Sequence, residues 1–165
     1  MRMELIQPFI NATDAVLSDM LNGPAGVSQV TMDDDVYRRK GVAASVAFHG
    51  DIEGRVIFDV ELDTARHVAS ALGQNSADPI EQTAGETICE LANIVVGNAV
   101  TLLNDGGYQF KVVPPKLHRS EKGYACSSES EAVVMCFETP SGAVYLNIAL
   151  DYSLQHSAFL PEPAV

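Results

Sequence analysis

A long helix is predicted by the segment PIEQTAGETICELANIVVGNAVTLLNDGG, which covers residues 79–107. Its start carries a capping Asp78, Pro79 at the first helical position and Glu81 three residues after the cap. Its end is marked by NDGG, residues 104–107, because glycine favours the backbone conformation that terminates helices. We expect the rest of the chain to pack against this helix.

The predicted helix has two contrasting faces. Steps of three or four residues place five polar or small residues on one stripe: Glu86, Glu90, Asn93, Gly97 and Thr101. A second stripe, on the other side of the helix, is apolar: Ile88, Leu91, Val95, Ala99 and Leu102. The apolar stripe is expected to face a core, and the polar stripe is the candidate site.

Composition limits the classes of function. A chain of 165 residues with 47% hydrophobic residues is long enough for one domain with a core. Ten Lys and Arg against 22 Asp and Glu give a net charge of −12, which argues against binding to nucleic acid or to an anionic membrane. No apolar run approaches the ~18 residues of a membrane span. Cys89, Cys126 and Cys136 lack CxxC spacing, so we expect reduced thiols in a cytoplasmic protein.

The other elements are predicted from hydrophobic periodicity. Residues 4–21 are expected to form a helix, and a second, short helix is expected to begin at Asp63. Six segments alternate like strands: 27–32, 42–48, 55–61, 108–113, 132–138 and 143–151. This order predicts an α+β fold, a largely antiparallel sheet of about six strands with the helices, including the long one, on one face. We expect one domain over residues 1–152 and a loosely ordered tail over 153–165.

Several kinds of chemistry lack support in the sequence. There is no Walker sequence, GxGxxG, HExxH or GxSxG. The Asp run at 33–35 lacks the further oxygen ligands of a Ca²⁺ loop, so no metal site is predicted. The four histidines are scattered singly and are expected to be surface or turn residues: His49, His67, His118 and His156.

The polar stripe allows two interpretations. Glu90 and Asn93 are three residues apart, so their tips can reach the same point outside the helix. A carboxamide can hold a water through one donor and one acceptor, a carboxylate can bind a partner's lysine, and Gly97 would allow close approach. An acid followed three residues later by Asn is, however, common on solvent-facing helices. The other interpretation is a solvated face with Gly97 serving internal packing.

A family resemblance bears on this choice. Residues 90–97, ELANIVVG, resemble the ExxNxxxG helix of the CheC/CheX/FliY phosphatases, which dephosphorylate the chemotaxis response regulator CheY. Further similar pieces are IQPFI at 6–10, FHG and GRV at 48–50 and 54–56, the prolines at 114–115 and LNIAL at 146–150. The first helix contains no ExxN, so the chain is similar to the CheX type, which keeps a single site.

The resemblance implies a function and a set of roles. The substrate would be the aspartyl phosphate of a CheY-like receiver domain, with Asn93 orienting the attacking water and Glu90 contacting the receiver's lysine. Glu86, Gly97 and Pro115 would bind the partner. Glu86 stands where the family often has Asp or Ser, and Pro115 is one residue nearer to Asn93 than the family's usual proline.

The resemblance also bears on cofactors and partners. No cofactor of its own is expected, because Mg²⁺ would be supplied by the phosphorylated receiver. A homodimer is expected. The alternative function is a non-catalytic receiver-binding or scaffold module of the same fold. A third possibility, a small-ligand sensor between helix and sheet, has no polar cluster to support it.

Overall fold

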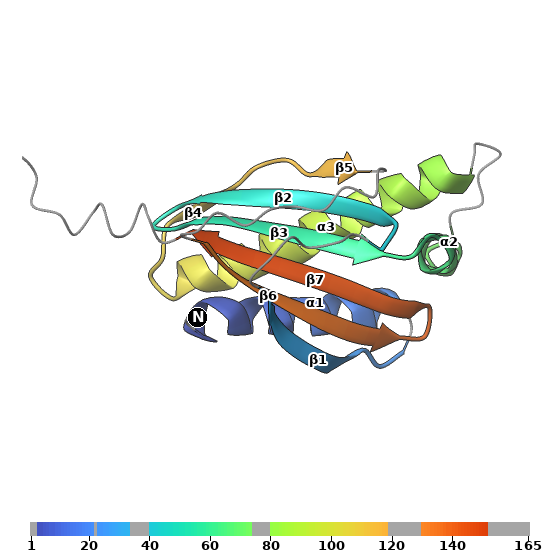
Figure 1. Cartoon of the computed structure of the whole chain (residues 1–165), viewed down its shortest axis with the longest axis horizontal. Helices are drawn as coiled ribbons and strands as arrows, with labels where there is room; N and C mark the ends of the chain where they lie inside the picture. Colours follow the sequence, from blue (N-terminus) through green and yellow to red (C-terminus); the bar gives the residue numbers. More distant parts are fainter. Residues whose placement is uncertain (1–2, 22, 34–39, 74–79, 119–129, 152–165) are drawn as a thin grey trace, which may run out of the picture.

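The computed structural model describes residues 3–21, 23–33, 40–73, 80–118 and 130–151 (Figure 1). Within these ranges the helices are α1 (Met3–Met20), α2 (Leu62–Ala71) and α3 (Ile80–Asp105). The strands are β1 (Gly26–Asp33), β2 (Val42–Gly50), β3 (Glu53–Val60), β4 (Phe110–Val112), β5 (Lys116–His118), β6 (Ser130–Thr139) and β7 (Gly142–Asp151).

The described strands form one antiparallel sheet. Their order is β1-β6-β7-β3-β2-β4, and β5 pairs with β2 beside β4. The predicted α+β class is confirmed, with α3 as the predicted long helix. The sheet has seven strands in this part of the chain rather than six, because the segment after Pro115 pairs with β2 as β5. The expected tail at 153–165 lies outside the described residues.

One side of the sheet and the helices form the main core. Alternate residues of β2, β3, β6 and β7 are buried there and include Phe48, Phe58, Phe137, Leu146 and Ile148. Helices α1 and α3 contact each other on this side, and α2 contacts α3 and β7 at the end of the sheet where α3 begins (Figure 1). This packing fixes the position of α3 on the sheet.

A glycine beneath an aromatic ring joins several elements. The register of β2 and β3 pairs Phe48 with Gly54, and a Cβ on Gly54 would overlap the Phe48 ring. The ring of Phe48 lies 5.5 Å from that of Phe9 in α1 and 5.3 Å from that of Phe110 in β4, measured between centroids. The missing side chain of Gly54 therefore allows one ring to connect α1, β2 and β4.

Helix α3 is a core helix with one departure from the predicted faces. Its buried apolar side chains are Ala84, Ile88, Leu91, Ala92, Val95, Val96, Ala99, Val100 and Leu103. Leu102 is predicted to be buried but is 48% exposed, because burial requires a facing neighbour as well as the right helical phase. By length and hydropathy alone Thr83–Asp105 could cross a membrane, but here its apolar side packs inside the domain. The expected cap, Asp78 and Pro79, lies outside the described residues.

Candidate functional site

The polar stripe lies on the exposed side of α3. Glu86, Glu90, Asn93 and Thr101 are exposed and Gly97 is half-buried, while the opposite side of the helix is in the core. Because the buried side fixes the helix, the carboxylate of Glu90 and the carboxamide of Asn93 project from a rigid support. A rigid support is what a site needs if it works by positioning groups rather than by reacting with the substrate.

Gly97 has no packing role within the described structure. A Cβ built at this position meets no atom within 4 Å. Glycine inside a helix is less stable than alanine by up to ~1 kcal/mol, so a glycine without a packing contact needs another reason. Within the described residues there is therefore no packing contact that requires glycine at position 97.

Thr101 differs from its neighbours on the stripe. Its hydroxyl donates a hydrogen bond to the backbone carbonyl of Gly97 at 2.9 Å. This bond directs the hydroxyl back onto its own helix, as is common for threonine inside helices. Thr101 is therefore surface rather than a group presented to a partner.

Pro115 lies beside α3 rather than on it. It is half-buried in the connection between β4 and β5, and both of these strands contact α3. The fold thus brings the β4–β5 connection to one flank of the helix that carries Glu90 and Asn93. Of the predicted residues, four share the exposed stripe and Pro115 comes from this flanking segment.

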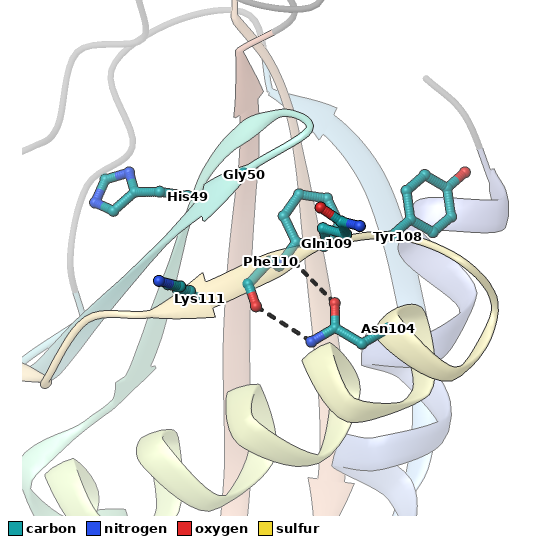
Figure 2. A pocket seen from close by; sticks show the side chains of 7 residues that line it. All are labelled: His49, Gly50, Asn104, Tyr108, Gln109, Phe110 and Lys111. Carbon is teal, nitrogen blue, oxygen red and sulfur yellow. Dashed lines mark hydrogen bonds between the residues drawn. The ribbon is translucent and has the colours of Figure 1, made fainter.

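A hollow of about 670 Å³ lies at the C-terminal end of α3. Its lining residues come from the ends of β2 and α3 and from β4 with the turn before it, and Figure 2 shows them: His49, Gly50, Asn104, Tyr108, Gln109, Phe110 and Lys111. Asn104 follows Glu86 by 18 residues, which is about five full helical turns, so it lies on the same stripe. The stripe therefore ends in this hollow.

Asn104 is the residue by which the sequence could have indicated this hollow. The NDGG pattern assigns it to the helix stop, although it also continues the three- and four-residue steps beyond Thr101. In the structure its carboxamide oxygen accepts a hydrogen bond from the Phe110 N–H at 2.9 Å, and its nitrogen donates to the Phe110 carbonyl at 3.2 Å (Figure 2). Asn104 thereby joins the end of α3 to β4.

The cysteines and histidines described by the structure lie outside the stripe. Cys89 is half-buried and Cys136 is buried, and neither forms a disulfide. His49 and His67 are exposed, as predicted; Cys126, His156 and the side chain of His118 are not described. Cys136 pairs with Tyr145 across β6 and β7. The pKa of the Tyr145 hydroxyl is raised, mainly because the hydroxyl is partly buried and secondly because the Cys136 thiol lies beside it.

These tyrosine and cysteine side chains point away from α3. Their neighbours along the strands, such as Met135 and Leu146, face the helices, and successive side chains of a strand alternate between faces. Cys136 and Tyr145 therefore belong to the opposite side of the sheet and are separate from the stripe.

Comparison with known families identifies the fold. A family model described as "Chemotaxis phosphatase CheX" matches residues 42–138, more than half of the chain and including all of α3. The chain belongs to the CheX family. The predicted resemblance is thus confirmed at the level of the family. A comparison with curated proteins found no match.

Solved structures agree with membership of the CheX family. The CheX–CheY–BeF₃–Mg²⁺ complex from Borrelia burgdorferi matches with 30% identity and a TM-score of 0.77, over 91% of this chain and 99% of that one. A chemotaxis protein CheX from Desulfovibrio desulfuricans matches with 23% identity and a TM-score of 0.78, over 90% and 99% of the two chains. A CheC-like superfamily protein from Shewanella sp. PV-4 matches with 22% identity and a TM-score of 0.80, over 92% and 99%. The last two show similarity of fold alone.

Proposed function

We propose that this chain accelerates hydrolysis of the aspartyl phosphate of a CheY-like receiver domain. Asn93 orients the attacking water and Glu90 anchors the receiver's lysine. The observation that carries the proposal is the exposed Glu90–Asn93 pair on a buried helix, one turn before a glycine with open space around it. Family membership supports a phosphatase role at the family level.

The partner is proposed from a relative. The Borrelia burgdorferi structure is a complex of CheX with CheY, BeF₃ and Mg²⁺. That protein is 30% identical to this chain, and the match covers 91% of this chain. A CheY-like receiver is therefore the partner class that we expect for the α3 stripe, with Glu86, Gly97 and Pro115 contributing to docking.

The proposed reaction requires positioning rather than covalent chemistry by this chain. The water oxygen forms a bond to phosphorus while the bond from phosphorus to the aspartyl oxygen breaks, which releases phosphate and a free carboxylate. The Asn93 carboxamide holds the water through one donor and one acceptor and takes no proton, so the protons remain with phosphate and solvent. Placing the water correctly lowers the entropic part of the barrier.

Glu90 has a separate task. Its carboxylate, three residues before Asn93, would bind an ammonium of the receiver and so set how deeply Asn93 enters. Among the residues that the structure describes, no group of three or more His, Cys, Asp or Glu could hold a metal ion. We expect Mg²⁺, which would neutralise charge on the phosphoryl group, to come with the receiver.

A receiver-binding module without catalysis would use the same stripe. Its support is Glu86, an exposed carboxylate one turn before Glu90 that adds charge for docking. Phosphate release from a panel of phosphorylated receivers of the same cell separates the two functions. We expect the wild-type chain to accelerate release from at least one receiver, whereas unchanged intrinsic rates with a bound receiver would favour the binding module.

We also propose that the chain forms a homodimer. Strand β1 is the last of the described strands on one side of the sheet, and its Val27 and Val30 are 41% and 47% exposed. An exposed edge strand with apolar side chains favours pairing with another chain. Light scattering should give about twice the 17.7 kDa of one chain, and a mass near one chain would contradict the dimer.

A further inference from the structure

We propose that the hollow at the C-terminal end of α3 is a second contact point for the same receiver, and that it binds a carboxylate next to an apolar side chain. This inference rests on the proposed function, because it uses the receiver as the partner. It assigns a role to residues outside the Glu90–Asn93 site.

The first argument is the continuity of the surface. Asn104 belongs both to the α3 stripe and to the lining of the hollow. It follows Asn93 by 11 residues, which is about 16 Å along the helix axis. A standard interface covers about 800 Å² on each partner, which is a disc of about 16 Å radius. A receiver of ordinary size docked over Asn93 therefore reaches the hollow.

The second argument is charge. Lys111 is exposed, and its ammonium makes no ion pair with the residues described by the structure. The register places it directly opposite His49, whose ring already contacts the Glu53 carboxylate. In a chain with 22 acids and ten bases, an ammonium at this place favours a carboxylate from outside.

The third argument is the rigid aromatic floor of the hollow. The rings of Tyr108 and Phe110 are stacked with centroids 5.7 Å apart, and Phe110 is held edge-on by Phe48 in the core. Asn104 fixes the backbone of Phe110 through two hydrogen bonds, and the Asp51 carboxylate accepts a hydrogen bond from the Gln109 N–H at 2.9 Å. The hollow therefore offers a pre-formed aromatic surface and the Lys111 cation. These two features suit a receiver segment that carries an apolar side chain next to a carboxylate.

The hollow also depends on the close approach of β4 to β2. A Cβ on Gly50 would overlap the backbone carbonyl of Gln109. Glycine at position 50 therefore permits the Gln109 backbone to lie against the end of β2, where the hollow is formed. His49, Lys111 and the aromatic floor are brought together by this contact between segments about 60 residues apart in sequence.

The two ends of the docking surface then prefer opposite charges. Glu86 and Glu90 attract a basic group at one end, and Lys111 attracts an acidic group at the other. This arrangement fixes the direction in which a receiver lies along α3 and disfavours the reversed orientation. The acidic residue on the receiver should lie on the order of 16 Å from its phosphorylated aspartate, because Asn104 in the lining of the hollow is about 16 Å from Asn93 along the helix axis.

The test measures binding and turnover for Lys111→Glu. The probe is a CheY-like receiver loaded with beryllofluoride and Mg²⁺ for affinity, and the same receiver phosphorylated for kinetics. We expect affinity to fall about 10-fold or more and KM to rise with kcat unchanged, because the change affects docking and leaves Asn93 in place. Lys111→Gln should have a smaller effect. Lys40→Gln removes a charge beside Tyr145, and Lys40 does not line the hollow, so this variant should have no effect.

Charge exchange provides the sharper readout. Each receiver carboxylate about 10–20 Å from the phosphorylated aspartate is replaced by lysine. One of these receivers should bind Lys111→Glu better than it binds the wild-type chain. Equal affinity of Lys111→Glu and wild type for the receiver, or no rescue by any exchange, would overturn the inference.

The outcomes separate this inference from the proposed function. If the wild-type chain binds a receiver without accelerating hydrolysis, the proposed phosphatase function fails and the binding series still decides the role of Lys111. If hydrolysis is accelerated but Lys111→Glu behaves as wild type, only the inference about the hollow fails. If no receiver binds, both are wrong. Thermal melting of each variant establishes that the fold is intact.

Discussion

The two sides of α3 show opposite relations between stability and function. The buried side is filled by Ala, Val, Leu and Ile that contact the sheet and the other helices. The exposed stripe instead carries Asn93, Gly97 and Thr101, whose low helix propensity is not offset by burial in the core. The stripe lowers the intrinsic stability of the helix, and the buried side compensates. Residues that do not help folding and still occupy one continuous line are the ones to test for function.

The largest effect should follow from breaking the buried side. Leu91 is fully buried, so Leu91→Ala should lower the free energy of unfolding by about 2–5 kcal/mol through lost burial and the cavity left behind. Urea unfolding measures this change. Leu102→Ala makes the same chemical change on the exposed side and should cost less than about 1 kcal/mol; equal losses would contradict the assignment of the two sides.

Glu90→Gln tests anchoring by the stripe. Removing the charge should weaken receiver binding about 10-fold, since a charge-assisted contact to the receiver's lysine becomes a neutral one. The stability of the chain should stay within about 0.5 kcal/mol, because Glu90 is exposed. Titration of the beryllofluoride-loaded receiver measures the affinity. The matched control is Glu61→Gln, an exposed acid that makes no side-chain cap to α2, and a similar loss in both variants would argue for a nonspecific charge effect.

Gly97→Ala should change stability and binding in opposite directions. The methyl group meets no atom of the described structure, so the free energy of unfolding should rise by about 0.5–1 kcal/mol. Receiver affinity should fall several-fold as the methyl group enters the docking space. Asn98→Ala, an exposed change at the next position, should leave affinity unchanged. If Gly97→Ala bound the receiver as tightly as the wild-type chain, the proposal that Gly97 provides clearance for docking would be wrong.

Thr101→Ala should have the smallest effect. The hydroxyl bonds to its own helix at the Gly97 carbonyl, so its loss should change stability by less than about 0.5 kcal/mol. Phosphate release from the receiver should remain within about twofold of wild type. A larger effect on the rate of phosphate release would indicate that Thr101 contacts the receiver.

Much of α3 could be predicted from sequence because its signals are local. The glycine stop and the three- and four-residue steps predict the length of the helix and its exposed stripe, and the structure places the helix at Ile80–Asp105. Leu102 shows the limit of this reasoning, since its helical phase is that of a core residue but no neighbour covers it. The roles of Glu90 and Asn93 remain predictions from family resemblance.

The features that the sequence did not predict depend on contacts between segments that are distant in the chain. β5 has only three residues directly after Pro114-Pro115, and it is a strand because it pairs with β2. The hollow combines the ends of β2 and α3 with β4, and the register that places His49 opposite Lys111 sets its position. The open space around Gly97 also depends on tertiary structure, because sequence alone allowed either packing or clearance.

The most direct test of the proposed function compares two asparagines on α3. Asn93 and Asn98 are both exposed, but they lie about 140° apart around the helix. Phosphate release from a phosphorylated CheY-like receiver is measured with Asn93→Ala and Asn98→Ala at saturating receiver, together with receiver affinity. We predict that Asn93→Ala loses on the order of 10²-fold or more in kcat with its affinity retained, while Asn98→Ala matches wild type. Equal kcat for Asn93→Ala and wild type would contradict the proposal that Asn93 positions the water.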